Sequence, residues 1–304
     1  HNFLFYAEYN LRLFFKLLFY KCDYILANDL DTLPACFIAS KFKKTKLVYD
    51  SHELFSEGPE LQGRSFVKGF WKQLEHFFLP RIKKSYTVSQ SIADYYNSKY
   101  NSHFGVVKNV PLLQREFVKI DAKFPTNTKT ILYQGVLNPG RGIKPMIKAL
   151  HFLENVDLII IGYGKVEAAL QQFVKDELLE NRVHFLGRIP HEELPNYTKL
   201  ATMGMVLEEP LGLSFEYSLP NKLFDYIHSE LPIICGKLPE IKNVVENHKV
   251  GIVVDDYKPE TIANAIFKLI EDKELYKQIK INQQKAKIDF CWEKEQKLLE
   301  NYFN

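Results

Sequence analysis

The chain has 304 residues, of which 46% are apolar and 25% charged, and its 40 basic residues against 37 acidic ones leave a formal charge of +3. A chain of this length forms about two domains of roughly 150 residues each, and its composition excludes wholesale disorder. The small net charge argues against a dedicated nucleic-acid binder, and no apolar run approaches the roughly 20 residues needed to span a bilayer.

The start of the chain and the placement of its cysteines are both informative. The chain opens at His1 without a Met and runs directly into an apolar, aromatic stretch, so we expect the first domain to lack its beginning here. Scattered cysteines without metal-ligand spacing suit a reducing cytosol, where a buried thiol is a small apolar side chain. The four cysteines are Cys22, Cys36, Cys235 and Cys291.

Ten short apolar runs recur along the chain, with helical patterns between them. Continuous apolar runs separated by helices are typical of parallel strands buried on both faces. The alternation predicts a doubly wound α/β fold. The predicted strands are 24–27, 46–49, 86–88, 105–107, 131–133, 158–161, 183–186, 204–207, 232–235 and 251–254.

This series breaks once, over residues 111–129, which are polar, contain two prolines and show no clear strand or sustained helix. We place the linker between two α/β domains in this segment. Ligands of such folds bind outside the carboxyl ends of the strands. The loops that follow strands are therefore where chemistry is expected.

A basic, aromatic-rich helical pattern covers residues 11–20. One interpretation is a helix packed on the first sheet, with Arg12 and Lys16 at its solvent edge. The alternative is a helix lying on a membrane surface, which needs an apolar face and basic residues. Basic clusters at 41–44 and 81–84 lie in the same half of the chain.

A glycine-rich motif over residues 133–142 follows a predicted strand and opens a helix. Its glycines, Gly135, Gly140 and Gly142, allow the backbone to approach a ligand closely. The N-terminus of a helix favours a phosphate, and Arg141 adds a planar set of donors suited to phosphate oxygens. The alternative is an ordinary strand-to-helix turn, which the arginine between two glycines makes less favoured.

A second motif runs from Ser218 to Tyr226, with Pro220 expected in the first turn of a helix and Ser218 as its cap. A lysine in that turn, Lys222, opposes the helix dipole unless an anion is bound. Asp225 can accept two hydroxyl hydrogen bonds, as a ribose diol would supply. The alternative is a surface pair between Lys222 and Asp225.

Two further loops follow predicted strands. His52, in the motif Asp50-Ser51-His52-Glu53, lies where a loop would enter a ligand site, although a structural histidine is the alternative. Gly162-Tyr163-Gly164 lacks the third glycine of a dinucleotide fingerprint, which argues against a nicotinamide or flavin cofactor and a dehydrogenase.

Taken together, the motifs resemble those of a GT-B glycosyltransferase of family 4, the retaining class that uses nucleotide-sugar donors. The resemblance covers nearly the whole chain and rests on motifs at 50–55, 88–92, 108–111, 133–142, 185–190, 220–234 and 290–292. It implies two Rossmann-like, doubly wound parallel-sheet domains facing each other across a cleft. The acceptor-side domain would cover 1–112, the nucleotide-sugar-binding domain 113–288, and a crossover helix returning to the first domain 289–304.

The resemblance also implies roles for individual residues. Arg141 and Lys222 would hold the donor diphosphate and stabilise charge on the leaving group. Asp225 would bind the ribose, and His52 would approach the transferred sugar. Gly187, Arg188 and Ile189 would frame the base. The other implied donor-binding residues are Gly135, Gly140, Gly142, Ser218, Leu219 and Asn221.

We therefore expect a retaining enzyme that moves a sugar from a UDP- or GDP-sugar to a glycan or lipid-linked acceptor in cell-surface polysaccharide assembly. We expect it to be cytoplasmic and peripheral to the inner face of the cell membrane, with no metal, no cofactor besides the donor substrate and no nucleic-acid partner. The alternatives are a non-catalytic nucleotide-sugar-binding protein and a nucleotide-sugar epimerase of the same fold.

The sequence departs from the family pattern at three places. Val136 stands where relatives often carry Arg, and we expect Lys222 to replace that charge. Tyr217 takes the first of two positions, eight apart, that are usually glutamates, with Glu216 beside it and Asp225 in the second. The glycine-rich acceptor loop expected near the start of the first domain is absent from this sequence.

Overall fold

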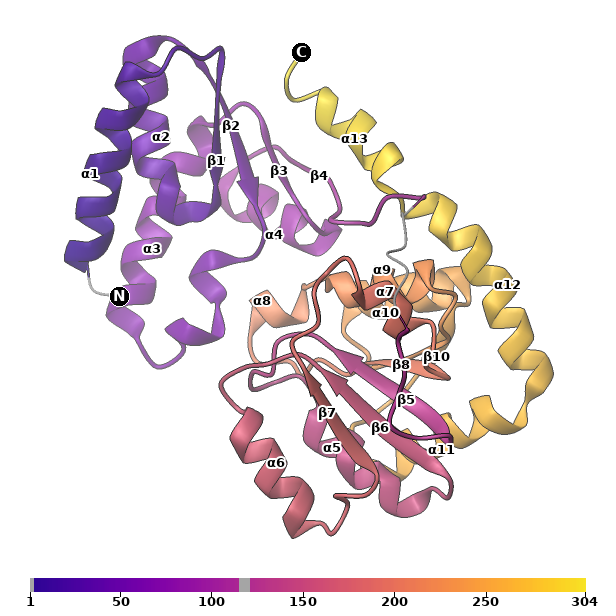
Figure 1. Ribbon diagram of the computed structural model, residues 1–304. Helices are drawn as coiled ribbons and strands as arrows, with labels where there is room; N and C mark the ends of the chain where they lie inside the picture. The colour runs from indigo at the N-terminus through magenta and orange to yellow at the C-terminus, as the bar shows by residue number, and fades with distance from the viewer. Residues whose placement is uncertain (1–2, 115–120) are drawn as a thin grey trace. The chain divides into compact units, whose positions relative to one another are not determined.

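The computed structural model describes residues 3–114 and 121–304 (Figure 1). The chain divides into two compact units, each built on one parallel sheet. Unit 1 comprises His1–Asn109, Leu211–Ser218 and Glu295–Asn304, and unit 2 comprises Val110–Pro210 and Leu219–Lys294. All ten predicted strands are confirmed, each to within about two residues at its ends.

The sheet of unit 1 has four parallel strands in the order β1-β2-β3-β4. These are β1 (Tyr24–Asn28), β2 (Lys46–Ser51), β3 (Ser85–Thr87) and β4 (Phe104–Val106). The helices of this unit are α1 (Phe3–Phe19), α2 (Asp29–Lys43), α3 (Ser65–Phe78), α4 (Gln90–Tyr100) and the short α8 (Leu213–Glu216). Ser89 caps α4 by accepting a hydrogen bond from the backbone N–H of Ile92, which explains a serine directly before this helix.

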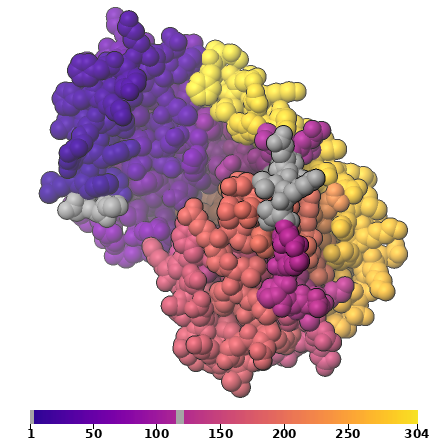
Figure 2. Space-filling model, in the orientation of Figure 1, coloured from indigo at the N-terminus to yellow at the C-terminus, as the bar shows by residue number. Residues whose placement is uncertain are grey.

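Helix α1 packs one face on the core of unit 1, through Leu13, Phe14 and Leu17. Arg12 is exposed and pairs with Glu8 one turn away, in agreement with the packed-helix interpretation. The outer face also carries large apolar side chains, and α1 lies in the indigo surface of Figure 2. Within the described ranges, no helix combines the length and apolar character needed to cross a membrane.

The sheet of unit 2 has six parallel strands in the order β10-β9-β8-β5-β6-β7. The strands are β5 (Lys129–Gln134), β6 (Val156–Ile161), β7 (Val183–Gly187), β8 (Met203–Val206), β9 (Ile233–Cys235) and β10 (Gly251–Val253). The helices are α5 (Ile143–Ala149), α6 (Glu167–Asp176), α7 (Leu194–Thr198), α9 (Asn221–His228), α10 (Pro239–His248), α11 (Pro259–Glu271) and α12 (Lys273–Asp289), and α13 (Trp292–Glu300) ends in unit 1.

Alternate residues of the central strands of unit 2 enter two separate cores. Ile131 and Tyr133 pack with α5 and α11 on one face of the sheet, whereas Leu132 packs with α9 and α10 on the other. Side chains of a strand point alternately to its two faces, so a strand covered on both sides is apolar over most of its length. This is why continuous apolar runs predicted the strands correctly.

The division into units differs from the predicted domains at three places. Unit 2 begins at Val110 rather than 113, because Val110 packs in the core beneath α9. The final return to unit 1 begins at Glu295 rather than 289, because Phe290 belongs to that same core. The segment Leu211–Ser218 joins unit 1, which the sequence did not predict.

The predicted linker agrees with the structure where the structure describes it. Residues 111–114 and 121–128 contain no helix or strand, and β5 begins at Lys129. Residues 115–120 of the predicted linker lie outside the described residues.

Candidate functional site

The loops at the carboxyl ends of the central strands of unit 2 are joined by backbone hydrogen bonds. The N–H of Gly135 donates to the carbonyl of Ile161 at 2.9 Å, and the N–H of Gly162 donates to the carbonyl of Gly187 at 2.8 Å. A Cβ on Gly162 would lie 1.8 Å from the Gly135 carbonyl oxygen, so only glycine permits this approach. Gly162 therefore allows these two loops to pack closely.

The glycine-rich loop after β5 also lies against the end of β8. The carbonyl of Gly140 accepts a hydrogen bond from the N–H of Glu209 at 2.9 Å. Gly142 has a left-handed φ of 66°, and a Cβ there would lie 2.1 Å from the carbonyl oxygen of Leu207. These contacts hold Arg141, between the two glycines, at the carboxyl edge of the sheet.

Three charged side chains meet where this loop and α9 reach the end of β8. The Oε1 atom of Glu208 lies 2.8 Å from Nζ of Lys222 and 3.5 Å from Nη1 of Arg141. Glu208 is completely buried and Lys222 is 8% exposed, so the charges interact with little screening by solvent. The Lys222 Nζ atom also lies 4.0 Å from the ring centroid of Tyr133. The structure thus brings together the two cations predicted to hold a diphosphate.

Asp225 lies one turn after Lys222 on α9 and is 9% exposed. Its Oδ2 atom accepts a hydrogen bond from Nε2 of Gln134 at 3.2 Å, and Oε1 of Gln134 accepts one from the Thr198 hydroxyl at 2.8 Å. Both Lys222 and Asp225 are buried and engaged with other residues. The alternative of an exposed surface pair is therefore wrong.

The start of α9 differs from the prediction. Pro220 is the extended residue before the helix, not part of its first turn, and the helix begins at Asn221. Ser218 does not cap the helix, because its hydroxyl donates to the carbonyl of Phe215 at 2.7 Å. Leu219, 8% exposed, packs in the core beneath α9. Lys222 remains in the first turn, as predicted.

The loop after β7 carries the residues predicted to frame a base. Gly187 has a left-handed φ of 67°, and nothing lies within 4 Å of the position that a Cβ would occupy there. The guanidinium of Arg188 lies 5.4 Å from the ring centroid of Tyr163, in the loop after β6. Ile189 is half-buried and packs against the core beneath α9.

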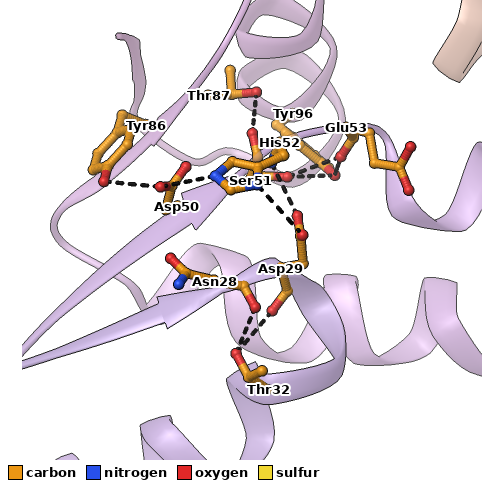
Figure 3. A network of polar contacts seen from close by, with 10 residues as sticks. All are labelled: Asn28, Asp29, Thr32, Asp50, Ser51, His52, Glu53, Tyr86, Thr87 and Tyr96. Atoms are coloured by element: carbon orange, nitrogen blue, oxygen red, sulfur yellow. Dashed lines mark hydrogen bonds and ion pairs between the residues drawn. The ribbon is translucent and has the colours of Figure 1, made fainter. Parts of the chain in front are cut away.

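His52 lies in unit 1, directly after β2, within a network of polar contacts (Figure 3). Its Nε2 atom is 3.1 Å from Oδ2 of Asp50, and its backbone N–H donates to Oδ1 of Asp29 at 3.0 Å. The Tyr86 hydroxyl donates to the same Asp50 oxygen at 3.0 Å. The His52 side chain stays 56% exposed. The ring is thus held by carboxylates while solvent, or a ligand, can reach it.

The hydrogen bond to Asp50 raises the pKa of His52 above its ordinary value, against the opposing effect of burial. We expect Asp50→Asn to lower the pKa of His52, which an NMR titration of the ring would measure. Because the pKa of His52 is raised in the folded state, its protonated ring stabilises the fold. This contribution is complete below about pH 6.5 and is lost as the pH rises through the pKa of the folded state. Asp94→Asn, on the exposed side of α4, is the matched control; an equal shift in both variants would contradict this assignment.

The expectation of a metal-free site overlooked the sequence Asp29-Leu30-Asp31, which has the Asp-x-Asp pattern. Asp29 opens α2 with a left-handed φ of 59°, and its carboxylate accepts the hydrogen bond from His52. Burial raises the pKa of Asp29. Over residues 3–114 and 121–304, no three His, Cys, Asp or Glu side chains are arranged to hold a metal ion.

Tyr217, at the first of the altered glutamate positions, belongs to unit 1 and packs on its core. Its carbonyl accepts a hydrogen bond from the Ser89 hydroxyl at 2.8 Å. Asp225, at the second position, belongs to unit 2. The two positions are therefore held by different cores.

Four polar residues of these networks were missed by the sequence analysis as site residues: Asp29, Gln134, Thr198 and Glu208. A signal existed for three of them. Asp29, Gln134 and Glu208 all lie at or just after the carboxyl end of a strand, which is the criterion that singled out His52. Thr198 carried no such signal, because it ends a short helix.

Comparisons with known proteins agree on one class. The sequence model of the family described as glycosyl transferases group 1 matches residues 114–286. An uncharacterized glycosyltransferase of Methanocaldococcus jannaschii, MJ1069, is 26% identical over 96% of this chain and 77% of its own length. The chitobiosyldiphosphodolichol beta-mannosyltransferase of Kluyveromyces lactis is 23% identical over 89% of this chain and 69% of its own.

Among solved structures, Anabaena HepE in complex with UDP-glucose superimposes with a TM-score of 0.78 at 20% identity. The match covers 96% of this chain and 81% of HepE. At this identity the likeness concerns the fold, and it confirms the predicted arrangement of two doubly wound parallel sheets.

Proposed function

Because the chain belongs to the glycosyl transferases group 1 family and is a glycosyltransferase of GT-B fold, we propose that it transfers a sugar from a nucleoside-diphosphate sugar with retention of anomeric configuration. The proposed acceptor is a glycan or lipid-linked glycan of cell-surface polysaccharide assembly. The UDP-glucose complex of HepE supports this donor class, and the name of the Kluyveromyces relative supports a lipid-linked acceptor.

One observation carries the proposal: Arg141 and Lys222 converge on a single buried point at the carboxyl edge of the sheet. A diphosphate leaving group gains negative charge as the glycosidic bond breaks. Cations already fixed in a poorly solvated site stabilise that charge without reorganisation. We propose that these two residues do so without a metal ion, and activity that survives EDTA is the expected result.

The position of Lys222 also supports the expectation that it replaces the arginine of the family pattern. A Cβ on Gly135 would lie 3.5 Å from Cε of Lys222, so the lysine stem passes beside the loop that carries Val136. Val136 itself is 49% exposed and offers no charge. Lys222 thus approaches the loop next to Val136, the position where the family pattern often has an arginine.

The remaining donor contacts follow from the same edge of unit 2. We propose that Asp225, oriented by Gln134, accepts hydrogen bonds from the ribose hydroxyls. The open backbone at Gly187 and the residues Arg188 and Ile189 would frame the base. In unit 1, the exposed His52 ring would contact the transferred sugar, with Asp50 and Asp29 fixing its orientation.

The test is thermal unfolding of the protein with UDP, GDP, ADP and NAD, followed by product analysis with the matching nucleotide sugar. A ligand at 100 times its Kd stabilises the folded protein by about 2.7 kcal/mol. The melting temperature rises by roughly 2–4 °C per kcal/mol for domains of this size, so the expected shift is several degrees. We expect selective stabilisation by UDP or GDP, and a product whose anomeric configuration by NMR equals that of the donor. Stabilisation by NAD instead, or an inverted product, would contradict the proposal.

We also propose that the first unit meets the inner face of the cell membrane. Exposed apolar residues on α1, among them Leu11, Phe15 and Phe19, lie beside Arg12 and Lys16. Such a helix suits an anionic lipid surface. Sedimentation with anionic vesicles, reversed by high salt, is the expected result, and a protein that ignores these vesicles would contradict it.

A further inference from the structure

Glu208 has no place in the proposed function, yet it is the residue on which both candidate phosphate-binding cations converge. It lies two residues after the end of β8 and is completely buried. Its Oε1 atom lies 2.8 Å from Nζ of Lys222 and 3.5 Å from Nη1 of Arg141. Its backbone is fixed as well, because its carbonyl accepts a hydrogen bond from the Tyr257 hydroxyl at 2.5 Å.

The contacts of this carboxylate are incomplete. The Oε2 atom of Glu208 is buried and has no hydrogen-bond partner among the residues that the structure describes. Lys222 and Glu208 form a close ion pair but not a hydrogen bond, because the orientation of the Nζ group is unsuitable for one. Burying a carboxylate with an unpaired oxygen costs folding stability. If Glu208 served stability alone, we would expect a side chain whose polar atoms are all hydrogen-bonded at this position.

The charges suggest what the carboxylate does. Arg141 and Lys222 contribute two positive charges and Glu208 removes one. The donor and the product of a sugar transfer place different charges on this cluster. A free terminal phosphate ionises a second time near pH 6, so UDP at pH 7.5 carries about one more negative charge than a UDP-sugar.

We propose that Glu208 is a positioning residue that acts as a resident counter-ion. It holds Lys222 and Arg141 in place when no donor is bound, and it weakens the binding of the nucleoside-diphosphate product more than that of the donor. This inference rests on the proposed function, because it assumes that the two cations receive the diphosphate. The buried negative charge repels each bound phosphate in proportion to its charge. Product release is thereby favoured over donor release.

The first test is Glu208→Gln, with Kd measured for UDP and UDP-glucose, or for GDP and GDP-mannose where the guanine nucleotide is the one that stabilises the wild type. We expect the product to bind roughly tenfold more tightly and the donor to gain clearly less. The difference should shrink at pH 5, where the terminal phosphate loses its extra charge. Glu208→Asp keeps the charge, and its ratio of product to donor affinity should stay near that of the wild type.

A second variant pair tests the proposal where Glu208→Gln unfolds. Lys222→Met should weaken UDP binding, and adding Glu208→Gln to it should restore part of the lost affinity, because Arg141 then acts without an opposing charge. Weaker or unchanged product binding in Glu208→Gln, or no recovery in the double variant, would overturn the inference. A wild type that binds no nucleoside diphosphate would instead contradict the proposed function.

Discussion

Replacing Lys222 by alanine is expected to reduce kcat/KM for the donor by about 10²–10³-fold, since removal of one fixed charge-stabilising group typically costs that much. The side chain is 8% exposed and lies at the glycine-rich loop, so solvent offers no equal replacement. Steady-state kinetics with varied nucleotide sugar measure the effect. Lys242→Ala, on the exposed side of α10 and paired with Glu246, is the matched control and should retain full activity.

The loss of activity in Lys222→Ala must be distinguished from a loss of folding stability. Removing Lys222 leaves Glu208 with one cation fewer, and breaking a buried ion pair costs about 3–5 kcal/mol. The double variant Lys222→Met with Glu208→Gln removes both charges, so it should regain thermal stability while transfer stays slow. A Lys222→Ala protein with unchanged donor affinity, beside an Arg141→Ala protein that binds no donor, would show that Lys222 does not replace the family's arginine.

Gly142→Ala is expected to cause the largest loss of stability in the glycine-rich loop. The left-handed backbone costs about 1–2 kcal/mol for an alanine, and a Cβ at 2.1 Å from the Leu207 carbonyl oxygen adds an overpacking cost of about 1–3 kcal/mol or more. For domains of this size that is a decrease in Tm of roughly 2–4 °C per kcal/mol. Thermal unfolding without UDP measures the loss of stability, and the smaller stabilisation by UDP measures the loss of binding expected where Arg141 is displaced.

Gly187→Ala supplies the comparison within the same unit. Its φ of 67° matches that of Gly142, but nothing lies within 4 Å of the Cβ it would acquire. Only the backbone cost of about 1–2 kcal/mol should appear. Equal losses in the two variants would show that the approach to Leu207 does not determine the stability of the loop.

The sequence predicted the strands well because each buried strand of a doubly wound sheet must be apolar on both faces. Leu132 and Tyr133 are neighbours in the chain and belong to different cores, so the strand carries large apolar side chains on both faces. The unit that holds Leu211–Ser218 could not be predicted in the same way. Leu213 and Tyr217 are apolar enough for either core, and only the folded structure shows that they pack in unit 1.

The candidate site was predicted through its cations and glycines but not through their anionic partner. Arg141 and Lys222 stand out because a cation beside a glycine turn or at a helix start calls for an anion. Glu208 stands beside Glu209 and Pro210 and reads as part of a charged surface turn. Its place just after a strand marked it as a loop residue of interest, but its inward orientation accompanies an ion pair with Lys222 on a different element, and that pairing cannot be recognised from the local sequence.

The excursion of Leu211–Ser218 into unit 1 has a mechanical consequence for the charged cluster. Glu208 lies just before this segment and Lys222 just after it, so their ion pair closes a loop of chain whose middle belongs to the other unit. Both ends of this connection are thus held together in unit 2, whereas its middle packs on the core of unit 1. Breaking the ion pair between Glu208 and Lys222 would release the two ends from each other and leave the packing of the middle in place.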